Sequence, residues 1–165
     1  MSFHLIYSLV FVQLLIVGFL DFKTHKISNY WIFINFGFAF IFHAFFDYLY
    51  PLSWGTFIFP LSFIGVGFFL YLLGIMGAGD SKFLASLFLV IPLEYHIVLF
   101  EKIVFSTLAT GSIILFMKII FHRRTLIAYL LSRHWSGVKN IIKSRFSYAP
   151  VITLAWLLLG GELWL

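Results

Sequence analysis

The sequence predicts an all-α, polytopic membrane protein with about six transmembrane helices and an amphipathic helix at the cytoplasmic membrane surface. Three observations lead to this prediction. The 165-residue chain is 62% hydrophobic and only 10% charged, whereas a soluble domain carries about a quarter charged residues. Its apolar runs have the length of a bilayer crossing, and its basic residues gather between these runs. We expect a single domain over residues 1–165, because no linker or low-complexity tract interrupts the chain.

The first half of the chain contains three apolar runs, each expected to form one transmembrane helix. They are Phe3–Leu20, Ile27–Phe46 and Trp54–Met76. Each is close to the roughly 20 residues that a helix needs to cross the apolar core of a bilayer. The first run lacks the basic start and the small-residue cleavage site of a signal peptide, so we expect it to remain as a membrane helix.

The second half of the chain supplies the other three helices. The stretch Ser81–Phe121 is about twice as long as one crossing requires at about 1.5 Å per residue, so it must hold two helices. Pro92–Glu94 is the natural turn between them. The last run is Ala149–Leu165, in which Pro150 suits the first helical turn.

The charges between the runs predict the orientation in the membrane. Basic residues gather in the connections after the first, third and fifth helices: Lys23, Lys26, Lys82, Arg123, Arg124, Arg133, Lys139, Lys143 and Arg145. The opposite connections hold Asp47 and Glu94 and no basic residue. By the positive-inside rule the first set is cytoplasmic, which places both termini outside the cell membrane.

The segment Thr125–Phe146 has the pattern of a basic amphipathic helix. Apolar residues such as Leu130 and Trp135 fall on one side of a helical wheel, whereas Lys139 and Lys143 fall on the other. Such a helix lies flat on a membrane and binds the anionic headgroups of its lipids. The alternative interpretation is an ordinary solvated cytoplasmic loop.

Composition excludes several other classes of site. The chain has no cysteine, so disulfides and thiolate metal sites are absent. The six histidines show neither HxxxH nor HExxH spacing, and we expect no metal or other cofactor. The net charge of +5 does not indicate nucleic-acid binding, because the basic residues lie between runs of lipid-crossing length.

Two aspartates are the candidate catalytic residues. Asp21 ends the first helix, and Asp80 starts the fourth helix after two further crossings, so both are expected at the same membrane face and at similar depth. Either residue by itself would also fit a plain structural role, Asp21 as an interfacial anchor and Asp80 as a helix N-cap. Two adjacent carboxylates share one proton; one activates water as a general base while the other polarises a carbonyl group. The pair therefore predicts metal-free hydrolysis of a peptide bond.

The segments that contain these aspartates resemble the two signatures of the type IV prepilin peptidases, a branch of the GxGD membrane aspartyl proteases. Gly77–Lys82 reads GAGDSK and is similar to the GxGDxK motif of that family. Asp21–Asn29 reads DFKTHKISN. It is similar to the other signature of the family, in which an aspartate is followed by five residues and then by Ile-Pro-Asn. Ser28 stands in place of the proline. Tyr148–Pro150 resembles a small proline motif before the last helix of the family.

The resemblance implies a function and a set of site residues. Asp21 and Asp80 would be the catalytic pair, and the whole chain would form one transmembrane peptidase domain. Gly77, Gly79, Lys82 and Asn29 are the expected supporting residues of the site: the glycines would let a substrate backbone approach. Lys82 would tune the acids or anchor its helix to the headgroups.

The substrates of the family are pilin-like precursors with a short basic leader and a hydrophobic helix, cut at the cytoplasmic face. Larger members also methylate the product and carry a cysteine metal site. This chain resembles the small, peptidase-only members that serve Flp-type pili or archaeal preflagellins.

Two other functions are compatible with the sequence. In a small membrane transporter, Asp21, Asp80 and Lys82 would form an ion or proton site. The acids are predicted at the membrane boundary rather than at mid-bilayer, and no inverted repeat is evident, which favours the peptidase. In an inert assembly subunit of a pilus or secretion machine, the same motifs would be present without catalysis, and Ser28 leaves this interpretation open.

Overall fold

The computed structural model describes residues 3–24, 26–46, 48–74, 76–132, 136 and 148–163, and in these residues the protein is all-α. The helices are α1 (Phe3–Thr24), α2 (Asn29–Phe45), α3 (Trp54–Leu72), α4 (Ala78–Val90), the short 3-10 helix η1 (Leu93–Tyr95), α5 (His96–Phe121), α6 (Arg123–Leu131) and α8 (Ala149–Leu163). The predicted fold class is therefore confirmed for the described part of the chain.

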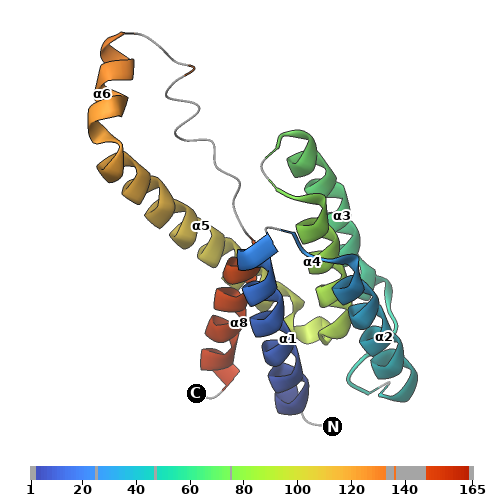
Figure 1. Cartoon of the computed structure of the whole chain (residues 1–165). Helices are drawn as coiled ribbons and strands as arrows, with labels where there is room; N and C mark the ends of the chain where they lie inside the picture. Colours follow the sequence, from blue (N-terminus) through green and yellow to red (C-terminus); the bar gives the residue numbers. More distant parts are fainter. Residues whose placement is uncertain are drawn as a thin grey trace.

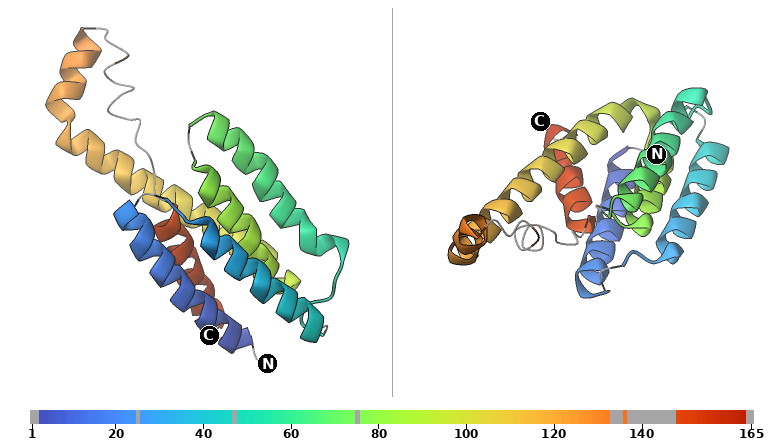
Figure 2. Two further views of the ribbon diagram at one scale, coloured as in Figure 1. Left: turned by 45° about the vertical axis from the view of Figure 1, so that its right-hand side comes forward. Right: turned by 90° about the horizontal axis from the view of Figure 1, so that it is seen from above.

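The helices pack as two groups. In one group α4 packs against both α2 and α3, and in the other α8 packs against both α1 and α5. Figures 1 and 2 show these groups beside each other, with the start of α1 and the end of α8 at one end of the bundle. The end of α1 and the start of α4 lie toward the opposite end (Figure 1). Residues of both groups contribute to one buried apolar core.

The surface and helix lengths are those of a membrane protein. Within the described residues, three helices are long and apolar enough to cross a bilayer: His4–Thr24, Trp54–Leu72 and Leu93–Phe121. Large apolar side chains such as Phe19 and Phe33 are more than 70% exposed, an exposure that is favourable in lipid and rare over so large an area in water. The helices α2, α4 and α8 have 17, 13 and 15 residues, so three of the six predicted spans meet the length criterion and the other three remain predictions.

Helix boundaries follow local backbone chemistry. The predicted turn at Pro92–Glu94 is present, since α4 ends at Val90 and α5 begins at His96. The predicted end of the third helix at Met76 is wrong: α3 ends at Leu72, and Gly74 follows with a φ of 69°. Only glycine adopts this left-handed conformation readily, and a glycine there commonly ends a helix.

The pair α1 and α8 is joined by Tyr7 and Trp156. The Tyr7 hydroxyl donates a hydrogen bond to the Trp156 carbonyl oxygen at 3.0 Å, and the Trp156 indole N–H donates to the Tyr7 carbonyl oxygen at 3.2 Å. The two rings stack with centroids 5.1 Å apart. These contacts satisfy both aromatic polar groups in an apolar interior and connect the helix that carries Asp21 to the end of the chain.

Only the beginning of the predicted amphipathic segment can be compared with the structure. Helix α6, Arg123–Leu131, follows α5 after a bend at His122 and extends away from the bundle (Figure 1). Its described residues include the exposed Ile127 and Leu131. The rest of the predicted segment, apart from Ser132 and Ser136, lies outside the described residues.

Candidate active site

Asp21 lies in the last turn of α1, on the buried face of that helix. The first helix does not end at Asp21, as the sequence predicts, but continues to Thr24. Its buried residues follow the three- and four-residue spacing of one helix face: Ile6, Tyr7, Val10, Gln13, Leu14, Val17 and Asp21. Asp21 is only 2% exposed and therefore points into the bundle.

Asp80 lies in the first turn of α4, where the preceding glycine motif shapes the helix start. Gly77 is the N-cap residue of α4. Its N–H donates a hydrogen bond to Oδ2 of Asp80 at 3.1 Å, and Asp80 is 9% exposed. The hydrogen bond fixes the carboxylate, and the free N–H groups of the helix start favour a negative charge there. Asp80 is thus a first-turn residue and not the N-cap itself.

The two sequence motifs meet in space. Gly79 packs against the backbone of Ile27, so closely that a Cβ atom on Gly79 would lie 3.1 Å from the Ile27 carbonyl oxygen. The carboxylate of Asp21 is near enough to that of Asp80 for the two negative charges to repel each other. The structure therefore brings both aspartates to one place between the two helix groups.

The other expected site residues lie in the same two sequence motifs as the aspartates. Asn29 is exposed in the first turn of α2, and Lys82 is exposed in α4. Ser28 is the N-cap of α2, and its Oγ accepts a hydrogen bond from the Tyr30 N–H at 3.3 Å. Serine is a favoured N-cap residue, so the replacement of the family's proline by Ser28 keeps a defined start for this helix.

A buried polar chain connects the helices that carry the acids, and the sequence interpretation missed it. Gln13 Nε2 donates to Asn35 Oδ1 at 2.6 Å, and Asn35 Nδ2 donates to Ser86 Oγ at 2.9 Å. The three side chains are at most 5% exposed and come from α1, α2 and α4. The available signal was a polar residue inside each of three apolar runs, because such residues in membrane helices usually bond to another helix.

We expect Asn35→Leu to lower the activity of the site while the protein still folds. Leucine has a similar size but makes no hydrogen bond, so α1 and α2 lose their polar connection and Asp21 shifts relative to Asp80. A misplacement of about 1 Å can cost about a hundredfold in rate, and the lost bonds should cost about 1 kcal/mol of stability. The rate constant of the purified variant measures the effect. Ser106→Ala is the control, because that buried hydroxyl has no hydrogen-bond partner; an equal loss in both variants would contradict a specific role of the polar chain.

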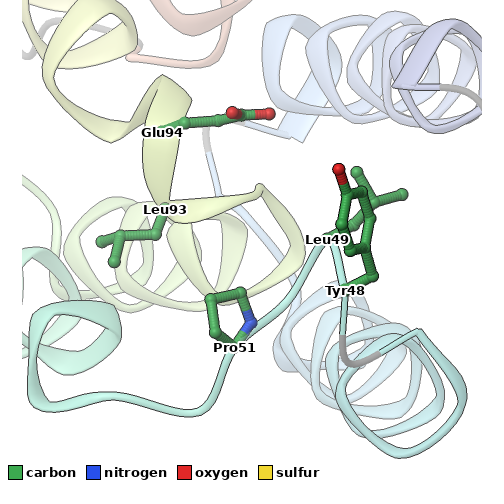
Figure 3. Close-up of a pocket in the computed structure, with 5 residues that line it drawn as sticks. All are labelled: Tyr48, Leu49, Pro51, Leu93 and Glu94. Carbon is green, nitrogen blue, oxygen red and sulfur yellow. The ribbon is translucent and has the colours of Figure 1, made fainter.

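A pocket lies beside the loop that follows α2, and Figure 3 shows the residues that line it. It has a volume of about 490 Å³ and is lined by the loop after α2 and by η1: Tyr48, Leu49, Pro51, Leu93 and Glu94. Among these described lining residues Glu94 is the single carboxylate, so this pocket offers no acid pair. Over the described residues of the whole chain, no three histidine, aspartate or glutamate side chains gather as a metal site would require.

Comparison with known proteins identifies the chain from its sequence as a whole. The model of the type IV leader peptidase family matches residues 8–163, which confirms the predicted family. The matched range includes both aspartates and the helices that hold them. No curated protein and no solved structure shows significant similarity to the chain.

Proposed function

Because the chain belongs to the type IV leader peptidase family, we propose that it is a membrane-embedded aspartyl endopeptidase. It removes the leader peptide of type IV prepilin-like precursors at the cytoplasmic face of the membrane. The observation that supports this most strongly is the meeting of Asp21 and Asp80, both buried and within electrostatic reach of each other. A pair of acids that shares one proton can hydrolyse a peptide bond without a metal.

The proposed reaction uses one proton shared by the two acids. Two adjacent carboxylates cannot both ionise cheaply, so in this proposal one holds a proton while the other stays charged. The charged acid takes a proton from a water molecule, whose oxygen attacks the scissile carbonyl carbon as the protonated acid donates to the carbonyl oxygen. Collapse of the tetrahedral intermediate breaks the C–N bond, and the leaving amine receives a proton from the pair.

The surrounding residues have supporting roles in this proposal. The Gly77 N–H holds one oxygen of Asp80, which leaves the other oxygen for the water or the substrate. Gly79 packs closely against the backbone of Ile27. Its small size therefore favours the contact between the two motifs as well as the approach of a substrate. Lys82 and Asn29 are exposed, so they can contact lipid headgroups or the precursor.

The orientation of the site follows from the charge distribution. The basic residues Lys23, Lys26 and Lys82 flank the two aspartates in the sequence, so the positive-inside rule places the acids at the cytoplasmic face. The start of α1 and the end of α8 lie at the other end of the bundle (Figure 1), which agrees with termini outside.

We therefore expect Ser136 to be cytoplasmic and Ser53 to be outside. The chain has no cysteine, so Ser136→Cys and Ser53→Cys each introduce a single thiol at an exposed position. A membrane-impermeant thiol reagent added to intact cells should label position 53 and reach position 136 only after lysis. The reverse pattern would show an inverted topology and place the acids on the wrong side for this reaction.

The proposed activity is tested by incubating the purified protein with pilin-like precursors and sequencing the new N-terminus of the product. Cleavage at the junction between the basic leader and the hydrophobic helix is the expected result. A transporter or an inert assembly subunit would leave every precursor intact, and this outcome would overturn the proposal.

A further inference from the structure

An apolar groove lies beside the candidate active site. It has α4 at its floor and α3 and α5 as its walls, and it encloses a volume of about 220 Å³. Phe63 and Leu70 line it from α3, and Phe100 and Leu108 line it from α5. The two wall helices α3 and α5 diverge from η1 toward the end where α4 begins (Figures 1 and 2).

The groove is continuous with the residues around Asp80. Met76 lines the groove directly before the glycine motif, and Leu84 lines it one helical turn after Asp80. Gly67, another lining residue, packs tightly against Ser81, the neighbour of Asp80. One end of the groove therefore lies at the level of the acids, and the rest extends from there along the helices toward Phe63.

The chemistry of the groove suits an apolar helix. Apart from Thr107 and Tyr148, its lining residues are apolar or glycine. The Thr107 hydroxyl donates a hydrogen bond to the Ile103 carbonyl oxygen of its own helix at 2.7 Å and so requires no partner from an occupant. Val66 and Leu108 are 58% and 65% exposed, so the groove opens sideways, where a membrane segment can enter without crossing the headgroups.

We propose that this groove binds the first turns of the hydrophobic helix of the precursor. The proposal rests on the proposed peptidase function. In such a precursor the helix directly follows the scissile bond, so a scissile bond held at Asp80 places the start of the helix beside Met76 and Leu84. The helix then continues along α3 and α5 into the membrane. The groove thus selects substrates by the apolar segment behind the cleavage site, whereas the acids act on the bond itself.

Val66→Trp tests the groove by narrowing it. For an intact precursor, KM should rise by about tenfold or more, because an apolar contact surface is lost, while kcat changes little. A short peptide with the leader and only the first residues of the mature protein should be cut at the wild-type rate. Leu61→Trp is the matched control, since Leu61 is 63% exposed on the opposite side of the same helix.

The result of this comparison separates the two proposals. If Val66→Trp and Leu61→Trp cleave the intact precursor with the same KM, the groove assignment is overturned. The proposed peptidase function is then unaffected. If the wild-type protein cuts neither substrate, the peptidase function itself fails, and the groove assignment with it.

Disulfide cross-linking locates the occupant directly. In the inactive Asp80→Asn background, Val104→Cys should cross-link to a precursor with one cysteine in the first two turns of its helix. Ile113→Cys, farther along α5 and exposed, should not. Equal cross-linking at both positions would show that the precursor contacts α5 without preference for the groove, and this would overturn the proposal. If Val104→Cys forms a disulfide with a second copy of the chain and not with the precursor, the groove binds that second copy. This result would also overturn the proposal.

Discussion

Asp21→Asn and Asp80→Asn should each lower precursor cleavage by about a thousandfold or more while leaving the protein folded and inserted in the membrane. In the proposed mechanism both acids take part in one proton-sharing unit, so an uncharged amide at either position removes both the base and the acid functions. Asparagine is nearly the same size as aspartate, and an amide is cheaper than a carboxylate at a lipid boundary, so insertion should not suffer. Cleavage rates at matched amounts of folded protein measure the effect.

Lys82→Ala is the control for the loss of a charge near the acids. Lys82 is exposed, whereas both aspartates are buried, so its removal should weaken cleavage far less than either aspartate change. The wild-type activity should also survive chelators and thiol reagents, because the proposed reaction uses no metal and the chain has no cysteine. A loss with Lys82→Ala as large as that with Asp21→Asn would contradict the special role of the acid pair.

The second large effect is expected for Gly67→Val, as a loss of stability. A Cβ atom on Gly67 would collide with both Cβ and Oγ of Ser81. The Cβ of Ser81 is fixed to the backbone and cannot swing away, so α3 must move off α4 beside Asp80. Overpacking of this kind costs about 1–3 kcal/mol, and the displaced α4 should also reduce cleavage. The melting temperature in detergent measures the first effect.

Gly65→Val on the same helix is the matched control, because a Cβ at Gly65 meets nothing within 4 Å. The two substitutions share the same change in helix propensity and differ only in the contact with Ser81. Equal melting temperatures for the two variants would contradict the close packing of α3 on α4.

Structural features that depend on the local sequence could be predicted, whereas features that depend on the packing of the helices could not. The turn at Pro92–Glu94 follows from chain length and from proline, and it is present in the structure. The end of α3 was missed because Met76 continues an apolar run, whereas Gly74 ends the helix by its backbone conformation alone. Hydropathy reports lipid compatibility, and it does not distinguish a helical residue from an apolar residue in a turn.

The same division applies to the candidate site. The spacing of charges and crossings predicts that Asp21 and Asp80 lie at one face, and their motifs indicate the family. The contact of Gly79 with Ile27 could not be predicted, because it depends on how two helix groups come together. The polar chain through Asn35 was visible only as single polar residues in separate runs; their partners are determined by the rotation of each helix about its axis.

The most direct test of the acid pair compares precursor cleavage by Asp21→Asn, Asp80→Asn and the double variant, each purified and present at the same amount of folded protein. If the two acids form one catalytic unit, both single variants are nearly inactive and the double variant is little worse than either. Near-normal cleavage by Asp21→Asn would leave Asp80 without its partner and contradict the proposed mechanism.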